Sequence, residues 1–335
     1  MRESVDEAAW EEALLADLAY EAALLPDRKL GSIFFGGGTP SLMPPRIVAR
    51  LIEAATAHWQ AADDVEITLE ANPSSVEAAK FADLANAGIN RVSLGLQSLR
   101  DGALKFLGRL HSVSEGLAAL DVAQAHFSRV SFDLIYARPR QSETDWYEEL
   151  SRALTFGTDH LSLYQLTIEP NTRFATDVRR GAFSPLDDDP AADLFEITRS
   201  LTDQAGIPAY EVSNHAKAGQ ESRHNLTYWR YQDYCGIGPG AHGRRNNHAT
   251  LRHKKPENWL DSVAENGHGL RAEAALSPPE QASEALLMGL RLAEGVSLPN
   301  LTARFNLGFE DLVDQKRLTM LHDLGFVWQS NERLG

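Results

Sequence analysis

The run IFFGGGTPS at residues 33–41 constrains the fold of this chain more than any other stretch. An apolar segment of β type ends there at three glycines, and Thr39, Pro40 and Ser41 are residue types that open a helix. Adjacent glycines let a backbone approach a ligand closely and adopt angles that other residues avoid. A strand, a glycine turn and a helix start in this order predict a small-molecule site at the carboxyl end of a parallel strand. A tight strand-to-helix turn without a ligand is the alternative.

The composition is that of an ordinary soluble globular protein. The chain has 335 residues, of which 43% are hydrophobic and 24% charged, enough for one large domain and a small one. Its net charge of −15 argues against a nucleic-acid partner, and the basic cluster at residues 252–255 is too small to reverse this. We find no apolar run of transmembrane length and no signal peptide, so the sequence predicts a cytoplasmic protein.

Short apolar segments alternate with helical ones through the first two thirds of the chain. The strand segments are residues 31–36, 65–70, 91–97, 129–136, 160–166 and 207–212. The helical segments are residues 4–25 with Ser4 as N-cap, 45–59, 75–87, 99–107, 113–126, 143–156 and 190–205. Strands that alternate with helices predict an α/β fold with a parallel sheet and right-handed crossovers.

Polar side chains lie at or near the ends of several predicted strands. Glu70, Gln97, Asp133 and Gln165 contribute two acids and two amides, beside the glycine turn. Because the carboxyl ends of parallel strands meet at one edge of a sheet, these residues predict a pocket there. Such a pocket suits a polar cofactor with an amino, carboxylate or ribose group. Alternatively, each residue caps a loop or is a satisfied buried polar group.

The stretch at residues 214–250 is rich in histidine, aromatic residues and glycine. His215, His224 and His242 lie close together in it, and imidazole is a common ligand of metals, including haem iron. A structural role for each histidine is the alternative.

The C-terminal part has a different pattern. Residues 246–275 read as a connecting stretch, with Trp259 as an anchor in a short helix. Helices are predicted over 278–294, 298–307 and 309–323, and a strand over 326–328, an arrangement similar to a winged helix. Acidic residues in the helix predicted over 309–323 disfavour DNA binding.

Seven motifs, in order along nearly the whole chain, carry a resemblance to a known family. They are FGGGTPS (35–41), EANP (70–73), SLGLQS (93–98), LGRLH (107–111), FDLIY (132–136), QLTIEP (165–170) and GIGPGAHG (236–243). Together they resemble radical S-adenosylmethionine (SAM) proteins of the oxygen-independent coproporphyrinogen III oxidase type, and within these the HemW haem chaperones. The resemblance implies a partial (β/α)6 TIM-like barrel, without its first strand, over residues 1–245 including a haem-region extension. It implies a small winged-helix-like α+β domain of HemN C-terminal type over residues 246–335.

The resemblance also implies a SAM site. The residues that would contact SAM are Gly37, Gly38, Thr39, Glu70, Gln97, Arg109 and Asp133. Their chemistry fits this role, because glycine amides can hold the methionine end and a carboxylate can take the ribose hydroxyls. Arg109 could pair with a carboxylate in bidentate fashion, with a surface salt bridge as the alternative.

The run HNLTYW at residues 224–229 matches the HNxxYW pattern that marks HemW within the family. It implies haem as cargo, haem-accepting respiratory proteins as partners, and His224 as a haem-site residue. His224 as a helix cap or core hydrogen-bonding group is the alternative. Two other functions stay open: a coproporphyrinogen III oxidase of porphyrin biosynthesis, and a binding protein without a cluster that keeps only a haem or SAM pocket.

The chain departs from the family at its iron–sulfur site. Radical SAM proteins hold a [4Fe–4S] cluster through a CxxxCxxC motif, whereas Cys235 is the single cysteine here, so the sequence predicts no metal ligands. Either the true start lies upstream and supplies the motif, or this is a relative without a cluster. We favour an upstream start, because the other SAM-contacting positions are present. The oligomeric state stays open.

Overall fold

A computed structural model gives the structure of the chain and describes residues 6–38, 40–330 and 332–335. The chain divides into two compact units, each built from separate segments. The first, which we call the sheet unit, comprises Phe34–Pro45 and Ile67–Glu221. The second, the terminal unit, comprises the described part of Met1–Ile33 together with Arg46–Glu66 and Ser222–Gly335. None of the described helices is long and apolar enough to cross a membrane.

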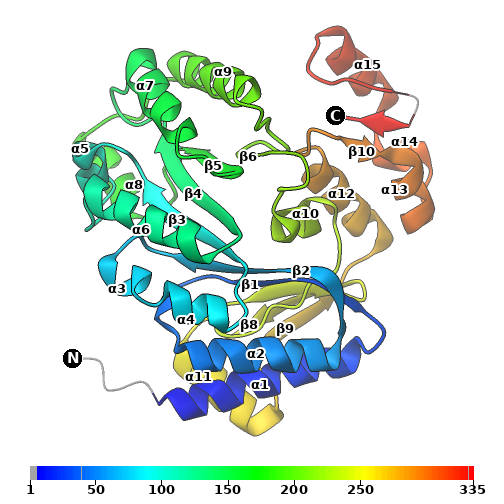
Figure 1. The fold of residues 1–335 in the computed structure, drawn as a ribbon. Helices are drawn as coiled ribbons and strands as arrows, with labels where there is room; N and C mark the ends of the chain where they lie inside the picture. The colour runs from blue at the N-terminus through cyan, green and yellow to red at the C-terminus, as the bar shows by residue number, and fades with distance from the viewer. Residues whose placement is uncertain (1–5, 39, 331) are drawn as a thin grey trace. The chain divides into compact units, whose positions relative to one another are not determined.

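The main sheet has six strands among the described residues, arranged in chain order. The strands are β1 (Lys29–Phe35), β2 (Gln60–Ala71), β3 (Arg91–Gln97), β4 (Arg129–Tyr136), β5 (His160–Gln165) and β6 (Asn214–Ala216). From β2 to β5 neighbouring strands are parallel, and β6 is antiparallel to β5. The curled sheet confirms the predicted α/β partial barrel (Figure 1).

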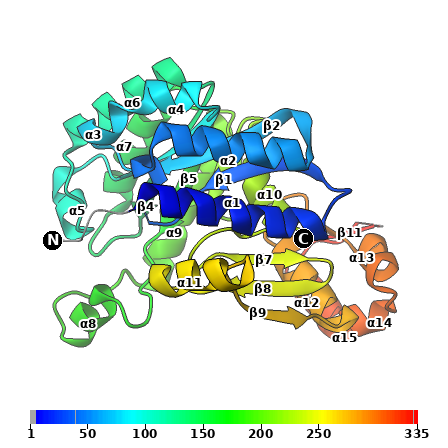
Figure 2. The ribbon, with the colours of Figure 1, turned by 90° about the horizontal axis from the view of Figure 1, so that it is seen from below.

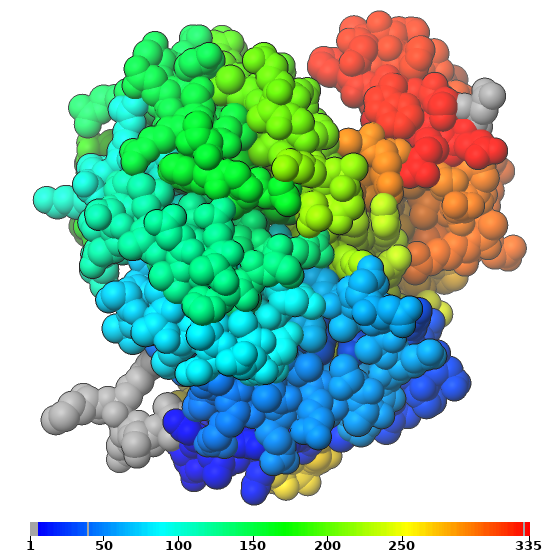
Figure 3. Space-filling model, viewed as in Figure 1, coloured from blue at the N-terminus to red at the C-terminus, as the bar shows by residue number. Residues whose placement is uncertain are grey.

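Helices of the sheet unit follow the strands, and all of them except α8 cover the outer side of the curled sheet (Figure 1). They are α3 (Ser75–Ala78), α4 (Phe81–Asn86), α5 (Asp101–Phe106), α6 (Val113–His126), α7 (Glu143–Leu154), α8 (Arg173–Arg179) and α9 (Asp188–Gln204). Capping boxes at Ser112 and Ser142 begin α6 and α7. Buried Trp146 of α7 donates to Thr198 Oγ1 of α9 at 2.8 Å. The space-filling view shows how closely these helices pack (Figure 3).

The terminal unit holds two small sheets and the remaining helices. Its helices are α1 (Glu7–Leu24), α10 (Arg223–Trp229), α11 (Pro256–Asn266), α12 (Pro278–Gly289), α13 (Leu298–Phe305), α14 (Phe309–Leu312) and α15 (Gln315–Asp323), with most of α2 (Pro45–His58). Its strands are β7 (His242–Arg245), β8 (His248–Arg252) and β9 (Leu270–Ala275) in an antiparallel sheet, and β10 (Val296–Ser297) paired with β11 (Arg333–Leu334). In Figure 2, α1 and α11 lie next to the three-stranded sheet.

A buried ion network joins α1 to this small sheet. Asp17 and Glu21 lie one turn apart on α1, and both are fully buried. Arg252 of β8 donates to Asp17 at 2.6 and 3.0 Å and to Glu21 at 3.0 Å. Arg245 of β7 donates to Glu21 at 2.5 Å. Each buried charge therefore has an opposite partner, without which its desolvation would be costly.

The glycine run at residues 236–243 packs onto the same network. The amide of Gly238 donates to Asp17 Oδ2 at 3.1 Å from a left-handed backbone with φ of 94°. At Gly236 a Cβ atom would lie 2.1 Å from the carbonyl oxygen of His242. This motif therefore has a structural role in the terminal unit.

The strand predicted over 207–212 is wrong. The last strand of the main sheet is Asn214–Ala216, antiparallel to β5. Pro208 lacks an amide donor, and the carboxylate of Glu211 accepts from the Ser213 amide at 3.0 Å, which forms a tight turn in place of a strand.

The prediction of a connecting stretch over 246–275 is wrong, because it holds β8, α11 and β9, but its predicted anchor Trp259 is confirmed as a buried residue of the helix α11. Asn246 and Asn247 have φ of 47° and 63° and form the two-residue turn between β7 and β8. Asparagine tolerates this left-handed backbone, so the pair was a readable hairpin signal.

Several predicted element ends differ from the structure. The first helix begins at Glu7 with Asp6 as N-cap, and the predicted cap Ser4 lies outside the described residues. The helices predicted over 75–87 and 309–323 are each split in two. No strand forms at 326–328, where the amide of Trp328 donates to the carbonyl of Gly335 at 2.7 Å.

We predict that Arg252→Met lowers the free energy of unfolding by about 3–5 kcal/mol, because it leaves the carboxylate of Asp17 buried without its cation, while Glu21 keeps Arg245. Urea denaturation measures the loss. The matched control is Arg46→Met, which removes an exposed arginine that pairs with Glu7 and Glu11 at the surface. We expect little change in the control. Equal losses in both variants would contradict a structural role for the buried network.

Candidate functional site

The glycine turn follows β1 as predicted. Gly37 and Gly38 have left-handed φ angles of 75° and 49°, and both are exposed. The amide of Gly37 donates to Glu70 Oε2, at the end of β2, at 3.3 Å. The turn therefore presents backbone groups to solvent beside a carboxylate. Thr39 lies outside the described residues, so its predicted role stays untested.

Asp133 lies in the middle of β4, close enough to Glu70 for the two carboxylates to repel each other. Burial raises the pKa of Asp133 to about 6; the neighbouring hydroxyls of Ser162 and Ser93 oppose the rise, and the charge of Glu70 adds to it. Burial of its carboxylate also raises the pKa of Glu70, although much of this side chain faces solvent, and the Gly37 amide lowers it. Two acids that share a partly desolvated space favour a cationic ligand.

Gln97 ends β3 in a strained conformation. It is buried, with φ of 68°, a left-handed angle that few residues other than glycine adopt. Its amide nitrogen packs over Gly95, where a Cβ atom would lie 3.3 Å from it. Strain of this kind often marks a functional position.

Arg109 and Gln165 lie in different surroundings: Arg109 is near the end of β3, and Gln165 has a hydrogen-bond partner in α9. Arg109 follows α5 and is half-buried. Burial lowers the pKa of His111, whose ring bonds the carbonyl of Leu96 at 3.2 Å, and the charge of Arg109 adds to this lowering. Arg109 therefore lies near the end of β3. Gln165 instead donates to the carbonyl of Ala191 in α9 at 3.1 Å, which gives it a structural partner.

The expectation that functional side chains lie at strand ends missed the side chains that surround Asp133. Ser93 donates to Asp133 Oδ1 at 3.3 Å, and Ser162 to Asn214 Oδ1 at 2.8 Å. Burial raises the pKa of Tyr164, and the charge of Asp133 raises it further. A readable signal existed, since polar residues two apart on a strand share one face.

His224 lies in a cluster of aromatic side chains in the terminal unit. The rings of His224 and Tyr228, one turn apart on α10, are 4.7 Å apart, and Tyr228 contacts Tyr234 at 4.4 Å. Tyr234 Oη and His242 Nδ1 share a hydrogen bond of 2.8 Å. The cluster thus joins two histidines to two tyrosines. Burial raises the pKa of Tyr228 to about 12, so this phenol is neutral near pH 7.

His215 does not belong to this cluster. It lies on β6, in the sheet unit, and is buried. Burial lowers the pKa of His215 to about 3, which keeps its imidazole neutral. Of the three histidines predicted together, the structure therefore gathers His224 and His242.

Cys235 packs in an apolar cluster of the terminal unit with Leu18 and Trp59. Burial raises the pKa of its thiol to about 12, and Glu21 adds to the rise. Among the described residues no three His, Cys, Asp or Glu side chains are grouped so as to hold a metal ion. A [4Fe–4S] cluster needs several thiolates, so the residues of this chain do not fit one.

Comparisons with known proteins match both ends of the chain to family models. Residues 7–153 match the radical SAM superfamily, and residues 276–335 match the HemN C-terminal domain. The chain is 41% identical over 302 residues to the mitochondrial radical S-adenosyl methionine domain-containing protein 1 of Bos taurus, covering 88% of this chain and 68% of that protein.

Two bacterial relatives are named heme chaperone HemW. Identity is 44% over 232 residues with the Escherichia coli protein, covering 69% of this chain and 60% of the relative. It is 33% over 289 residues with the Bacillus subtilis protein, covering 86% and 76%. The chain thus spans between 60% and 76% of the length of these relatives.

A solved structure of coproporphyrinogen III oxidase (HemN) from Escherichia coli, described as a radical SAM enzyme, has a similar fold. The TM-score is 0.80 at 21% identity, over 99% of this chain and 80% of that one. At this identity the likeness bears on the fold alone.

We predict that Asp133→Asn stabilises the ligand-free protein at neutral pH. The pKa of Asp133 is raised from 3.8 to about 6 in the folded state, so the wild type loses stability as pH rises between these values. The variant has no such loss, and its free energy of unfolding should exceed that of the wild type by about 3 kcal/mol above about pH 7, with most of the difference gone near pH 4. Urea denaturation across this range tests it. The control Asp121→Asn changes an exposed residue, and its stability relative to the wild type should be the same at pH 4 and pH 7. If the stability of Asp133→Asn relative to the wild type also stays constant over this range, the prediction is refuted.

Proposed function

The chain belongs to the HemW family of radical SAM proteins, and on this premise we propose that it binds haem and transfers it to acceptor proteins. The observation that carries the proposal is the histidine–tyrosine cluster around His224. Two relatives that are named heme chaperone HemW, at 33% and 44% identity, support it.

The cluster offers what haem binding needs. Imidazole is the commonest protein ligand of haem iron, and His224 and His242 each carry one. Tyr228 and Tyr234 pack between them and offer ring faces to a flat porphyrin. When His242 Nδ1–H donates to Tyr234 Oη, its other ring nitrogen is left as a lone pair for a metal. We propose His224 as the haem-site residue and His242 as its companion.

Membership of the radical SAM superfamily implies SAM as a cofactor, and the residues of the sheet unit fit it. When bound, SAM supplies a positively charged sulfonium centre joined to an amino acid and an adenosine. Glu70 and Asp133 can bind cationic or hydroxyl groups, and the exposed amides beside Gly38 can hold a carboxylate. Gln97 and Arg109 would complete the site at the end of β3.

The same membership implies a [4Fe–4S] cluster, for which the chain presents only the buried thiol of Cys235. We therefore derive no step that uses the cluster. The acceptor proteins, predicted to be respiratory, the cytoplasmic location and the boundary between residues 245 and 246 stay predictions.

We predict that His224→Ala weakens haem binding by at least about tenfold, because it removes an axial ligand. The measurement is an absorbance titration of the whole chain with haem in the Soret region. His126→Ala, which removes an exposed histidine of α6, is the control and should bind as the wild type does. Unchanged binding by His224→Ala would exclude His224 as the haem site.

We predict that Glu70→Gln weakens SAM binding by at least about tenfold, because a charged hydrogen-bond partner of the ligand is lost. Isothermal titration calorimetry with SAM measures this. Glu53→Gln removes an exposed acid of α2 and should leave the affinity unchanged. Equal affinities in the wild type and Glu70→Gln would remove Glu70 from the site.

A further inference from the structure

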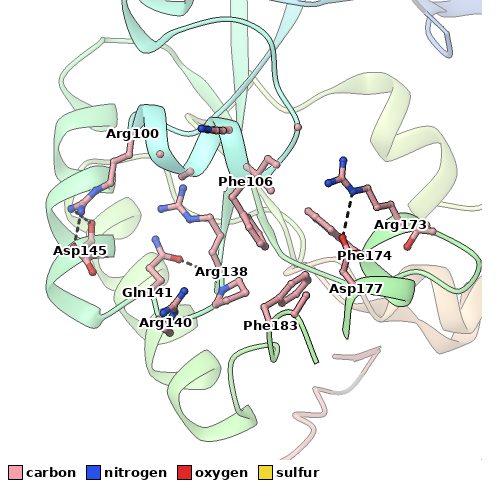
Figure 4. A pocket seen from close by; sticks show the side chains of 18 residues that line it. Arg100, Phe106, Arg138, Arg140, Gln141, Asp145, Arg173, Phe174, Asp177 and Phe183 are labelled. Carbon is pink, nitrogen blue, oxygen red and sulfur yellow. Dashed lines mark hydrogen bonds and ion pairs between the residues drawn. The ribbon is translucent and has the colours of Figure 1, made fainter. Parts of the chain in front are cut away.

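The sheet unit contains a cavity of about 850 Å³ that none of the predicted site residues lines. It gathers three segments that are distant in the sequence: α5 with the turn after it, the loop after β4, and α8 with the loop after it. Its volume lies in the range of small-molecule pockets, about 300–1,000 Å³. Figure 4 shows its side chains converging from these segments.

Three phenylalanines form the apolar part of the cavity. The rings of Phe106 and Phe174 stack at 5.1 Å and 19°. Phe183 meets both edge-on, at 5.1 and 5.6 Å. All three are only half-buried, so part of this aromatic surface is open to solvent. An exposed aromatic patch inside a cavity favours a ligand that covers it.

Basic side chains surround the rings. Five of them line the cavity against two carboxylates, in a protein whose net charge is −15. In Figure 4, Arg138 and Arg140 lie on one side of the rings and Arg173 on the other. The local excess of cations attracts an anion.

The arginines differ in their availability. Arg138 is buried and pairs with Glu149 and Ser98, so it belongs to the wall. Arg173 has a 90% exposed side chain and only a 3.4 Å contact with Asp177. Arg140 is exposed and has a left-handed φ of 61°, a strained angle at the cavity mouth. Arg140 and Arg173 are therefore the arginines open to a ligand, beside the exposed Lys105.

We propose that this pocket, which we call the Phe–Arg pocket, binds a planar aromatic ligand that carries carboxylates at its edge, the chemistry of a porphyrin with its propionates. The proposal rests on the proposed function and adds to it a tetrapyrrole site other than the His224 cluster. The macrocycle would lie against an outer ring face of the Phe106–Phe174 stack, and Arg140 and Arg173 would pair with its carboxylates.

Metal-free protoporphyrin IX is the probe, because it needs no axial ligand and so separates this pocket from His224. Fluorescence titration of the whole chain should give saturable binding. The double variant Arg140→Gln/Arg173→Gln should weaken binding by about tenfold or more, and the dimethyl ester of the probe should bind similarly weakly to the wild type. The matched control is Arg179→Gln/Arg180→Gln, in which two exposed arginines of the α8 region outside the pocket are changed. It should bind as the wild type does, as should His224→Ala.

Equal affinity of the pocket variant and the wild type, or of the probe and its dimethyl ester, would overturn the proposal. Displacement of the probe by ATP at lower concentration than by haem would overturn it in favour of a nucleotide site. If the probe fails to bind while haem binds through His224, the pocket proposal falls and the proposed function stands. If haem does not bind through His224 while the probe still binds through the arginines, the proposed function falls and the pocket stands.

Discussion

Burial of two neighbouring acids, Glu70 and Asp133, is the constraint on which the candidate cofactor site depends. Hydrogen bonds between parallel strands hold the two carboxylates near each other, and burial raises the pKa of each. A ligand-free protein gains no stability from such a pair, whereas a ligand with a positive centre would relieve the repulsion. The Gly37 amide and the Ser93 hydroxyl donate to these acids and keep them compatible with the fold.

The molecule presents three different kinds of binding chemistry. Carboxylates near the glycine turn suit the cationic parts of SAM, and the histidine–tyrosine cluster of the terminal unit suits haem iron. The Phe–Arg pocket of the sheet unit suits an aromatic anion. A carrier of a flat, charged, metal-bearing molecule needs contacts to the metal and to the aromatic anion. The histidine–tyrosine cluster and the Phe–Arg pocket share no residues, so each can be changed by substitution while the other is kept.

Sequence patterns predicted the central strands well, because β3 and β4 are apolar and flanked by clear turns. The rule that polar residues gather at strand ends correctly drew attention to Glu70 and to the glycine turn, whose hydrogen bond the structure shows. The rule missed Ser93, because it considered only the ends of strands and not the polar residues that share one face along a strand. Two-residue strands such as β11 have no periodicity to read. The Phe–Arg pocket was beyond prediction, since it joins α5, α8 and a loop through tertiary packing alone.

Haem transfer tests the central claim most directly. The whole chain is loaded with haem, freed of excess, and mixed with a haem-free respiratory haem protein, and the absorbance spectra of both proteins are followed after separation. A haem chaperone of the HemW family should release its haem to the acceptor, and the His224→Ala variant, loaded poorly, should deliver correspondingly less. Haem that stays on the chain, or the same delivery from the variant as from the wild type, would contradict the proposed function.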